Sequence, residues 1–331
     1  MDRQPSVLTR IPFFYFGLLL VLLGLGLYWT AIILSGVRLL TGSSMALRWS
    51  ETVLQSSEWP TAFGMLLAAV DLALMLPEKR RIERRIEAPP ATNYEATVAL
   101  TAYNDEESIE QAVLDFRRHP RVRRVLVVDN NSRDETAQRA TGAGAIVLRE
   151  MQPGYGRCVF RCLTEALRYD DTPLVVLCEG DCTFRAGDLE KLFAYAPHAD
   201  IVNGTRIIEQ LRATKTQLST FMYYGNFFAG KLLEVKHLGR GTFTDVGSTY
   251  KAIHREALAR LLPLLDPAVN LEFNAHFMDT ALANRFLMVE CPVTFHPRVG
   301  QSKGGNVNNL RALKTGLRMI LGLTASWKLL R

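Results

Sequence analysis

The sequence predicts an α/β domain with a mainly parallel sheet, preceded by a membrane anchor. Between residues 97 and 178, short apolar runs alternate with helical patterns, which is typical of parallel βαβ units. No charged residue occurs between residues 11 and 37, and such a stretch is long enough to span a bilayer. The apolar run at residues 174–178 is followed at once by two carboxylates, Glu179 and Asp181. These observations together predict a membrane-bound α/β protein with an acidic site.

The anchor is predicted over residues 1–88, with helices at about 11–36 and 59–77 and then a basic segment. A soluble core helix rarely runs as long as the first stretch without a charge, and no signal-peptide cleavage site stands out. The second stretch is of marginal length, so an interfacial or re-entrant segment is its alternative. It carries Asp71, which we expect to face the other helix or to snorkel. The basic residues that follow predict an anchor in the inner membrane and a cytoplasmic domain.

The net charge of the 331 residues is +6, and basic residues that flank a membrane explain it. No basic stripe with interleaved aromatic residues occurs, which argues against a nucleic-acid partner. The five cysteines suit a reducing compartment, and their spacing does not favour a zinc site. The sequence leaves the oligomeric state open.

The α/β domain is predicted over residues 89–309, after a proline-containing linker. Strands are expected at residues 97–101, 122–129, 145–148 and 174–178, with helices at 107–116, 134–141 and 157–168. Beyond residue 181 the pattern loosens, and we expect strands near 201–202, 246–252 and 287–289, and helices at 217–233, 255–262 and 271–283. Residues 310–331 alternate leucines with arginines and lysines, which predicts an amphipathic interfacial helix. A helix packed on its own domain is the alternative.

Polar residues follow several of the predicted strands, where an open α/β sheet binds its ligand. Glu179 and Asp181 can hold a divalent cation through oxygen ligands, and that cation could neutralise a diphosphate. Asp129 can accept hydrogen bonds from a ribose or a base. Glu106, taken alone, reads equally well as a helix cap. Gly154 and Gly156 open the third helix, where glycines let a ligand approach the backbone and the helix start favours anions.

In combination, these motifs resemble glycosyltransferase family 2, whose domain has the Rossmann-like GT-A fold. The resemblance lies in Thr-Ala-Tyr-Asn-Asp-Glu at 101–106, Val-Val-Asp-Asn-Asn-Ser-x-Asp-x-Thr at 127–136, Gly-Tyr-Gly at 154–156 and the acidic pair. It covers about residues 97–306. Segments 203–206, 245–251 and 292–303 are most similar to polyprenyl-phosphate glycosyltransferases such as dolichyl-phosphate mannose synthase.

The resemblance implies roles for the matching residues. Glu179 and Asp181 would hold Mg²⁺ or Mn²⁺ on the diphosphate of a UDP- or GDP-sugar, and Asp245 would lie near the reacting centre. Around the nucleotide the resemblance places Ala102, Tyr103, Glu106, Asp129, Asn131, Gly154, Gly156 and Gly180. It places three cations against the phosphates of donor and acceptor: Arg206, Arg298 and Lys303. The sequence departs from the family at Glu179, where an aspartate is usual, and at Thr183, where some members have a metal-binding glutamine.

The activity implied is an inverting, metal-dependent transfer of a sugar from a nucleotide to a polyprenyl phosphate, in cell-envelope glycan synthesis. A lipid phosphate is already largely ionised and needs little help from a base. A hydroxyl on a glycolipid or saccharide would need a base, and Asp245 is then the candidate. This non-processive transfer is one alternative, and a non-catalytic scaffold is another. No Gln-x-x-Arg-Trp motif occurs, which disfavours a polysaccharide polymerase, and the sequence names neither the sugar nor the nucleotide.

Overall fold

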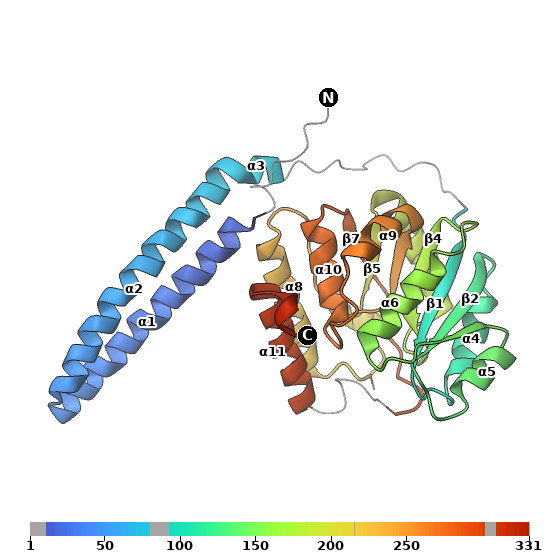
Figure 1. The fold of residues 1–331 in the computed structure, drawn as a ribbon, viewed down its shortest axis with the longest axis horizontal. Helices are drawn as coiled ribbons and strands as arrows, with labels where there is room; N and C mark the ends of the chain where they lie inside the picture. Colours follow the sequence, from blue (N-terminus) through green and yellow to red (C-terminus); the bar gives the residue numbers. More distant parts are fainter. Residues whose placement is uncertain (1–10, 80–92, 215, 302–308, 331) are drawn as a thin grey trace. The chain divides into compact units, whose positions relative to one another are not determined.

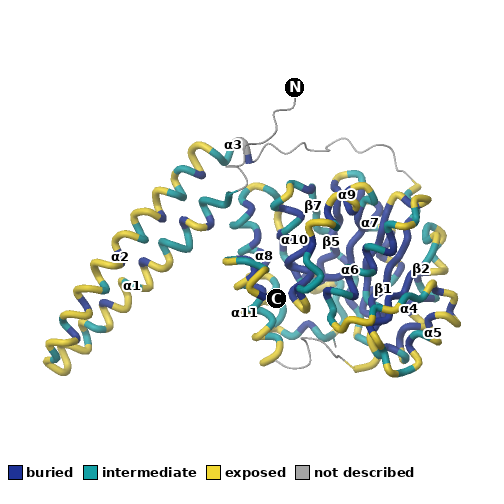
Figure 2. Tube along the Cα trace, viewed as in Figure 1, coloured by how far each residue is buried: buried dark blue, intermediate teal, exposed yellow. Residues whose placement is uncertain are grey.

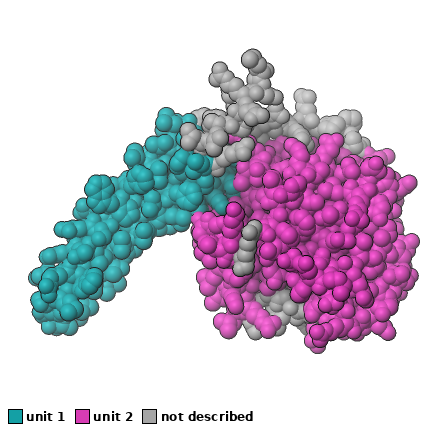
Figure 3. All heavy atoms as spheres, in the orientation of Figure 1, with its two compact units in different colours: residues 1–82, 234–240 teal, residues 83–233, 241–331 magenta. Residues whose placement is uncertain are grey.

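The computed structural model describes residues 11–79, 93–214, 216–301 and 309–330. The chain forms two compact units (Figures 1 and 3). The first comprises Met1–Ile82 and Glu234–Arg240, and the second comprises Glu83–Leu233 and Gly241–Arg331. Lys303 and the basic residues from Arg80 to Arg85 lie outside the described residues.

The first unit contains a helical hairpin of α1 (Phe13–Thr41) and α2 (Ser44–Val70). Both helices are long and apolar enough to cross a membrane by length and composition. The turn between them is short, because Gly42 takes a left-handed conformation and the Ser43 hydroxyl caps the next helix through Ala46 N. The second helix begins at Ser44, well before residue 59, the predicted start.

Small residues let the two helices of the hairpin approach closely. A Cβ atom added to Gly17 would lie 2.5 Å from the carbonyl oxygen of Gly64, and one added to Gly24 would meet the Thr61 hydroxyl. Close backbone approach at small residues is how helices associate in a membrane, where burial of apolar surface supplies no force. The role of the hairpin as a membrane anchor stays a prediction.

Asp71 faces the other helix, one of the two outcomes expected for it. Its Oδ2 atom accepts a hydrogen bond from Phe14 N at 2.6 Å, at the start of α1. The Lys79 ammonium lies 2.7 Å from the Asp71 carboxylate and donates to Ile11 O at 2.9 Å. Between them run a π-helical turn (Asp71–Met75) and α3 (Leu76–Lys79). The ion pair therefore ties the end of the second helix to the beginning of the first.

The second unit is built on one seven-stranded sheet in the order β3-β2-β1-β4-β6-β5-β7. The strands β1 to β4 are parallel neighbours, β6 runs antiparallel to β4 and β5, and β7 is parallel to β5. Their bounds are β1 Ala96–Ala102, β2 Val122–Asp129, β3 Ile146–Arg149, β4 Leu174–Glu179, β5 Ile201–Thr205, β6 Lys251–His254 and β7 Met288–Pro292. This is the mixed α/β sheet of a Rossmann-like fold, as predicted.

Helices cover both faces of the sheet and bury it completely in the middle (Figures 1 and 2). Alternate residues of β1 separate two cores: Val98 and Leu100 pack in one, and Ala99 packs in the other. The first core includes residues of α4 (Ile109–Arg117) and α7 (Leu189–Tyr195). The second includes residues of α6 (Tyr155–Ala166), α8 (Thr220–Lys236), α9 (Arg255–Leu261) and α10 (Phe273–Ala283). A short helix after β2, α5 (Thr136–Gly142), completes the parallel half.

The C-terminal segment folds as α11 (Asn309–Thr324) and a short 3-10 turn (Trp327–Leu330). It packs on its own domain, because Arg318 Nε lies 2.7 Å from Glu272 Oε1 and Trp327 Nε1 donates to Asp279 at 2.6 Å. Met319 and Leu323 join the second core. The helix nevertheless leaves a row of leucines exposed: Leu310, Leu313, Leu317 and Leu321.

Candidate active site

The predicted acids meet at one edge of the sheet because the strands that carry them are parallel and in register. Ala102 at the end of β1 pairs with Asp129 at the end of β2, and Thr101 pairs with Glu179 at the end of β4. Asp181 follows two residues later. The carboxyl ends of parallel strands form the ligand crevice in such sheets. The structure therefore brings together the nucleoside candidate and the metal candidates predicted from the sequence.

Gly180 sets the spacing of the acidic pair. A Cβ atom at this position would lie 2.5 Å from Ile109 Cδ1 and 3.2 Å from Thr101 O. Gly156 is also constrained, because a Cβ atom there would clash with the carbonyl oxygen of Val269. These two glycines are thus explained by packing of the elements around the site. Gly154 differs, since its φ of 140° is a left-handed conformation that favours glycine.

Asp181 is buried and has partners on both oxygens. Thr183 donates to Oδ1 from its backbone nitrogen (3.0 Å) and from its hydroxyl (2.6 Å). Arg298 Nη1 lies 3.0 Å from Oδ2. Burial and the charge of Glu179 raise the pKa of Asp181 to about 6, although Arg298 acts in the opposite direction. Asp181 is therefore a carboxylate whose ionisation depends on the cation beside it.

Arg298 bridges two carboxylates, since its Nη2 atom also lies 2.7 Å from Asp105 Oδ1. Asp105 in turn accepts a hydrogen bond from Tyr103 N at 3.0 Å, so the loop after β1 is tied to the same ion-pair group. The guanidinium predicted to meet phosphates thus lies in the site, where it neutralises acids that belong to two strand ends.

Glu179 lies against a group of hydroxyls that were not predicted as site residues. Thr249 donates to its Oε1 atom at 2.7 Å, and Tyr155 approaches the same atom at 3.4 Å. Asn274, on α10, donates to both hydroxyls. Burial and the charge of Glu179 raise the pKa of Tyr155 well above its ordinary value, so the phenol stays protonated. Tyr155 and Thr249 lie within quoted motifs, whereas nothing in the sequence marks Asn274.

Asp245 and Arg206 form a fully buried ion pair. The Arg206 Nε atom lies 2.7 Å from Asp245 Oδ2, and its Nη2 atom lies 2.7 Å from Asp245 Oδ1. The backbone nitrogens of Arg206 and Gly247 also donate to the Asp245 carboxylate. Burial alone would raise the pKa of Asp245, but the charge and hydrogen bonds of Arg206 outweigh it and leave the pKa below its ordinary value. Asp245 therefore anchors Arg206, and neither of its oxygens is available as a base in this arrangement.

Asp129 is fully buried, and one of its oxygens lacks a hydrogen-bond donor. Oδ1 accepts from Ser132 N at 3.2 Å. Oδ2 has no hydrogen-bond partner among the described residues, and the nearest cation is the exposed Arg149, at 3.8 Å. A buried carboxylate oxygen without a donor is costly, and a ligand N–H or O–H would satisfy it. This orphan oxygen fits the predicted contact with a base or ribose.

The other residues predicted around the nucleotide are arranged unevenly. Ala102 is buried, whereas Tyr103 and Asn131 are exposed. Glu106 is held by the loop after β2, because its carboxylate accepts a hydrogen bond from Glu135 N at 3.1 Å. Asn130 was not predicted, yet it donates to Glu150 O and Gln152 O and accepts from Gly154 N, so it holds the loop before α6.

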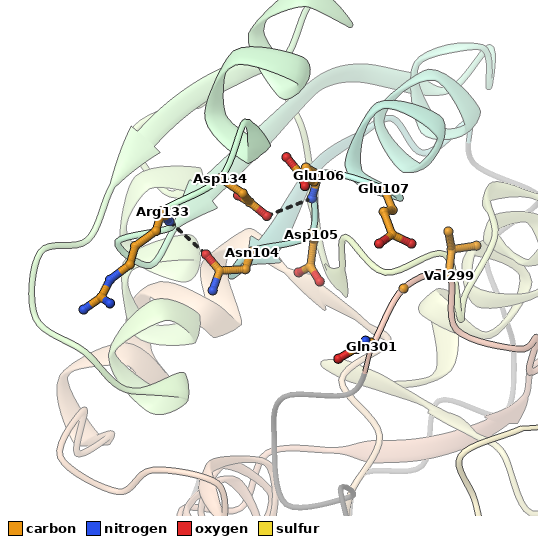
Figure 4. Close-up of a pocket in the computed structure, with 9 residues that line it drawn as sticks. Asn104, Asp105, Glu106, Glu107, Arg133, Asp134, Val299 and Gln301 are labelled. Atoms are coloured by element: carbon orange, nitrogen blue, oxygen red, sulfur yellow. Dashed lines mark hydrogen bonds between the residues drawn. The ribbon is translucent and has the colours of Figure 1, made fainter.

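A pocket of about 330 Å³ opens beside this edge, between the loop after β1 and Val299 to Gln301 (Figure 4). Acidic side chains dominate its lining, among them Asp105, Glu106, Glu107 and Asp134. Arg133 N donates to Asn104 Oδ1 at 2.8 Å and closes one wall. The acidic lining makes this pocket unsuited to a phosphate, whereas Arg298 offers positive charge at the edge.

Glu179 and Asp181 fit a divalent ion that takes its remaining ligands from a bound substrate and from water. No group of three or more His, Cys, Asp or Glu side chains in the described part of the chain is placed to hold a metal by itself. Mg²⁺ is usually bound by one or two carboxylates together with substrate phosphates and water. Glu179 and Asp181 supply that donor set.

The chain is similar in sequence to known glycosyltransferases. Residues 97–262, half of the chain, match the model of glycosyl transferase family 2. The protein is 28% identical over 234 residues to the glycosyltransferase AglJ of Haloferax volcanii, covering 67% of this chain and 69% of that one. It is 41% identical over 111 residues to an uncharacterised glycosyltransferase of Mycobacterium tuberculosis, covering 33% of this chain and 48% of that one. The matched segment thus spans about half the length of this relative.

Among solved structures, glucosyl-3-phosphoglycerate synthase from Mycobacterium tuberculosis has a similar fold. The crystal structure with Mn²⁺, UDP and glucosyl-3-phosphoglycerate superposes with a TM-score of 0.52 at 18% identity, covering 72% of this chain and 85% of that one. That likeness is one of fold, and it confirms the GT-A architecture. From the match to the family model, the chain belongs to glycosyl transferase family 2.

Proposed function

We propose that this protein transfers a sugar, with inversion and with a divalent metal, from a nucleotide-diphospho-sugar to a polyprenyl phosphate at the cytoplasmic face of the inner membrane. One observation carries the transferase assignment. The orphan Oδ2 atom of Asp129 and the carboxylates of Glu179 and Asp181 lie at one sheet edge, separated by a single strand. A nucleoside at the first and a diphosphate at the second match the two ends of such a donor.

In the proposed donor complex, Asp129 accepts a hydrogen bond from the base or ribose. Glu179 and Asp181 hold Mg²⁺ or Mn²⁺ against the diphosphate, together with phosphate oxygens. When bound, the ion neutralises the negative charge that gathers on the leaving diphosphate. A glycosyltransferase that has UDP and Mn²⁺ bound in its crystal structure shares this fold, which supports the same type of donor here.

The state of Asp245 favours a phosphate acceptor over a hydroxyl. Both of its oxygens are engaged by Arg206 and by backbone nitrogens, so it is poorly placed to remove a proton from a hydroxyl. A phosphate monoester is largely ionised at neutral pH and needs no base. Its oxygen would attack the anomeric carbon from the face opposite the leaving diphosphate. Arg206 would bind this acceptor phosphate, and Arg298 and Lys303 would add positive charge around both phosphates.

The membrane assignment rests on the apolar hairpin and on α11. Two close-packed helices long enough to span a bilayer suit an enzyme whose acceptor is a lipid. The exposed leucines of α11 alternate with basic residues such as Arg311 and Lys314, and such a face binds anionic headgroups. These features also support a closer relation to polyprenyl-phosphate glycosyltransferases within the family.

A transfer assay with purified full-length protein tests the proposal. The protein, in nanodiscs, would be incubated with Mn²⁺, a panel of labelled UDP- and GDP-sugars and a polyprenyl phosphate. The expected result is label in the lipid fraction that is released by mild acid, because the sugar is joined through a phosphodiester. Asp181→Asn should abolish the signal, and Asp170→Asn, an exposed acid after α6, serves as the matched control.

Other outcomes separate the alternatives. Label found only on a hydroxyl of a glycolipid or saccharide would show that the acceptor is a hydroxyl and not a phosphate. The assignment as a transferase would stand. No transfer from any donor, together with donor binding that Asp181→Asn leaves unchanged, would indicate a non-catalytic scaffold.

A further inference from the structure

The carboxylate of Glu179 is held through one oxygen only. Thr249 Oγ1 donates to Oε1 at 2.7 Å, and the Tyr155 hydroxyl lies 3.4 Å from the same atom. Within the described ranges of the chain, Oε2 has no hydrogen-bond partner. One oxygen of this predicted metal ligand is therefore fixed by the protein, and the other is open.

The sheet register explains why Thr249 meets Glu179. The antiparallel ladder between β4 and β6 pairs Leu174 with His254 and ends at Leu177 and Lys251. Continuing the same register by two residues places Thr249 opposite Glu179. Residues directly opposite each other on antiparallel strands have neighbouring side chains. The contact is thus a consequence of the topology in which β6 lies beside β4.

The hydrogen bonds form a chain with a defined direction. Asn274 Nδ2 donates to the carbonyl of Gly247 at 3.2 Å, and a carbonyl can only accept, so the Asn274 atom that Lys251 reaches at 3.4 Å is Oδ1. Asn274 Nδ2 therefore faces Tyr155 (3.0 Å) and Thr249 (3.2 Å). Thr249 has a single hydroxyl proton and gives it to Glu179, so Tyr155 is the donor in the 2.5 Å contact between the two hydroxyls.

We propose that Thr249, Tyr155 and Asn274 are positioning residues that hold Oε1 of Glu179 and thereby direct Oε2 towards the divalent ion of the donor complex. The inference rests on the proposed function, because it assigns these residues to the same metal site. It also accounts for the length of the Glu179 side chain. An aspartate is one methylene shorter, and it would not reach Thr249 and the ion together.

The test measures Mn²⁺ binding to full-length protein in the presence of UDP, by electron paramagnetic resonance and without turnover. Thr249→Val keeps the side-chain shape and removes the donor, and it should weaken Mn²⁺ binding about tenfold, as loss of an outer-shell partner does. Thr249→Ser restores the hydroxyl and should bind within about twofold of the wild type. Tyr155→Phe should weaken binding in the same direction, which keeps the test informative if Thr249→Val fails to fold.

The matched control is Thr172→Val. Thr172 is equally buried, and its hydroxyl pairs with Thr97 at 2.9 Å near the start of β4, away from the acidic pair. This variant should leave Mn²⁺ affinity unchanged. A second control introduces Thr249→Val into a Glu179→Asp background, where the shorter side chain no longer reaches Thr249. There the substitution should add less than about a twofold change, because the two residues act as a unit.

In turnover assays, Thr249→Val should raise the KM for Mn²⁺ and leave kcat at saturating Mn²⁺ nearly unchanged. Equal Mn²⁺ affinity in the wild type and Thr249→Val, or an equal loss in both Glu179 backgrounds, would overturn the positioning role and leave the proposed function standing. Absence of Mn²⁺ binding in the wild type with either UDP or GDP would overturn both. The three results are distinguishable within one titration series.

Discussion

Arg298 forms an ion pair with Asp181, with 3.0 Å between Nη1 and Oδ2. This oxygen is also one that a divalent ion on the donor diphosphate would need. In the proposed donor complex, a guanidinium and a metal ion would therefore compete for the same carboxylate oxygen, and both would stabilise its ionised form. The pair couples three quantities that are measured separately: metal affinity, the pKa of Asp181 and the position of Arg298.

The first prediction concerns pH. Asp181 binds a metal ion only when ionised, so Mn²⁺ affinity of the wild type should fall as the pH drops through about 6, its raised pKa. Arg298 lowers this pKa, so Arg298→Gln should move the midpoint to higher pH. Titrations with Mn²⁺ and UDP between about pH 5 and pH 8 measure it. Arg123→Gln, which alters an exposed pair with Asp171, is the control. A midpoint that stays in place or moves down in Arg298→Gln would contradict the coupling.

The second prediction concerns the orphan oxygen of Asp129. Asp129→Asn retains an acceptor for Ser132 N and replaces the unpartnered Oδ2 by an amide nitrogen. UDP or GDP binding, measured by calorimetry, should weaken about tenfold or more, because a hydrogen bond to a charged group is worth about 1.5–3 kcal/mol. The Tm should not fall, since the variant removes a buried charge. Nucleotide affinity equal to that of the wild type would exclude Asp129 from the donor site.

The third prediction concerns the Asp245–Arg206 pair. Asp245→Asn leaves the Arg206 charge buried without its counter-charge, which costs about 3–5 kcal/mol. At about 2–4 °C per kcal/mol, the Tm of the domain should fall by roughly 6 °C or more. Arg206→Gln should be similarly harmful, and the double variant should be less destabilised than the sum of the two. Additive losses would show that the pair does not act as a unit.

The fourth prediction concerns the hairpin. Gly17→Val places a side chain where even a Cβ atom would lie 2.5 Å from Gly64 O, whereas Gly26 on the same helix has open space around it. Thermal unfolding in detergent should therefore be strongly lowered by Gly17→Val and little changed by Gly26→Val. If the two variants behave alike, the helices do not pack through Gly17.

The fifth prediction concerns α11. Leu313→Gln with Leu317→Gln removes exposed apolar groups and should leave the fold intact. Transfer to a long polyprenyl phosphate in vesicles should drop, because the interfacial face is weakened, while transfer to a short water-soluble analogue should not. Leu264→Gln, an exposed leucine elsewhere on the domain, is the control. Equal losses with both acceptors would exclude a role in membrane contact.

The parallel half of the sheet was predictable because its strands are continuous apolar runs separated by helical patterns. The ends of β1, β2 and β4 carry the acids, so the position of Asp129, Glu179 and Asp181 at one edge followed from topology alone. Beyond Asp181 the sequence was less informative. A strand was expected at residues 246–252, but β6 is confined to Lys251–His254. The preceding residues bind side chains instead, as Gly247 N does with Asp245.

What could not be predicted is the set of partners that each site residue would find. Asn274 lies on a helix far along the chain, and its contact with Tyr155 depends on how α10 packs against the sheet. The start of α2 at Ser44 was missed because residues 44–58 are too polar for a membrane pattern, although Ser43 is a good N-cap. Alternation and strand ends are local signals, whereas these contacts require the tertiary structure.

The residues proposed for the donor and those proposed for the acceptor come mainly from two different parts of the chain, before and after β5. Everything proposed for the donor precedes β5, except for Thr249 and Asn274, which are proposed to brace Glu179, and for Arg298 and Lys303, which are shared. Arg206 and Asp245, proposed for the acceptor, come after it. On these proposed roles, recombination near residue 200 should exchange the acceptor preference and leave the nucleotide preference with the N-terminal half. In such a chimera, residues 179 and 249 would come from different parents. They must still be compatible, because their side chains are in contact.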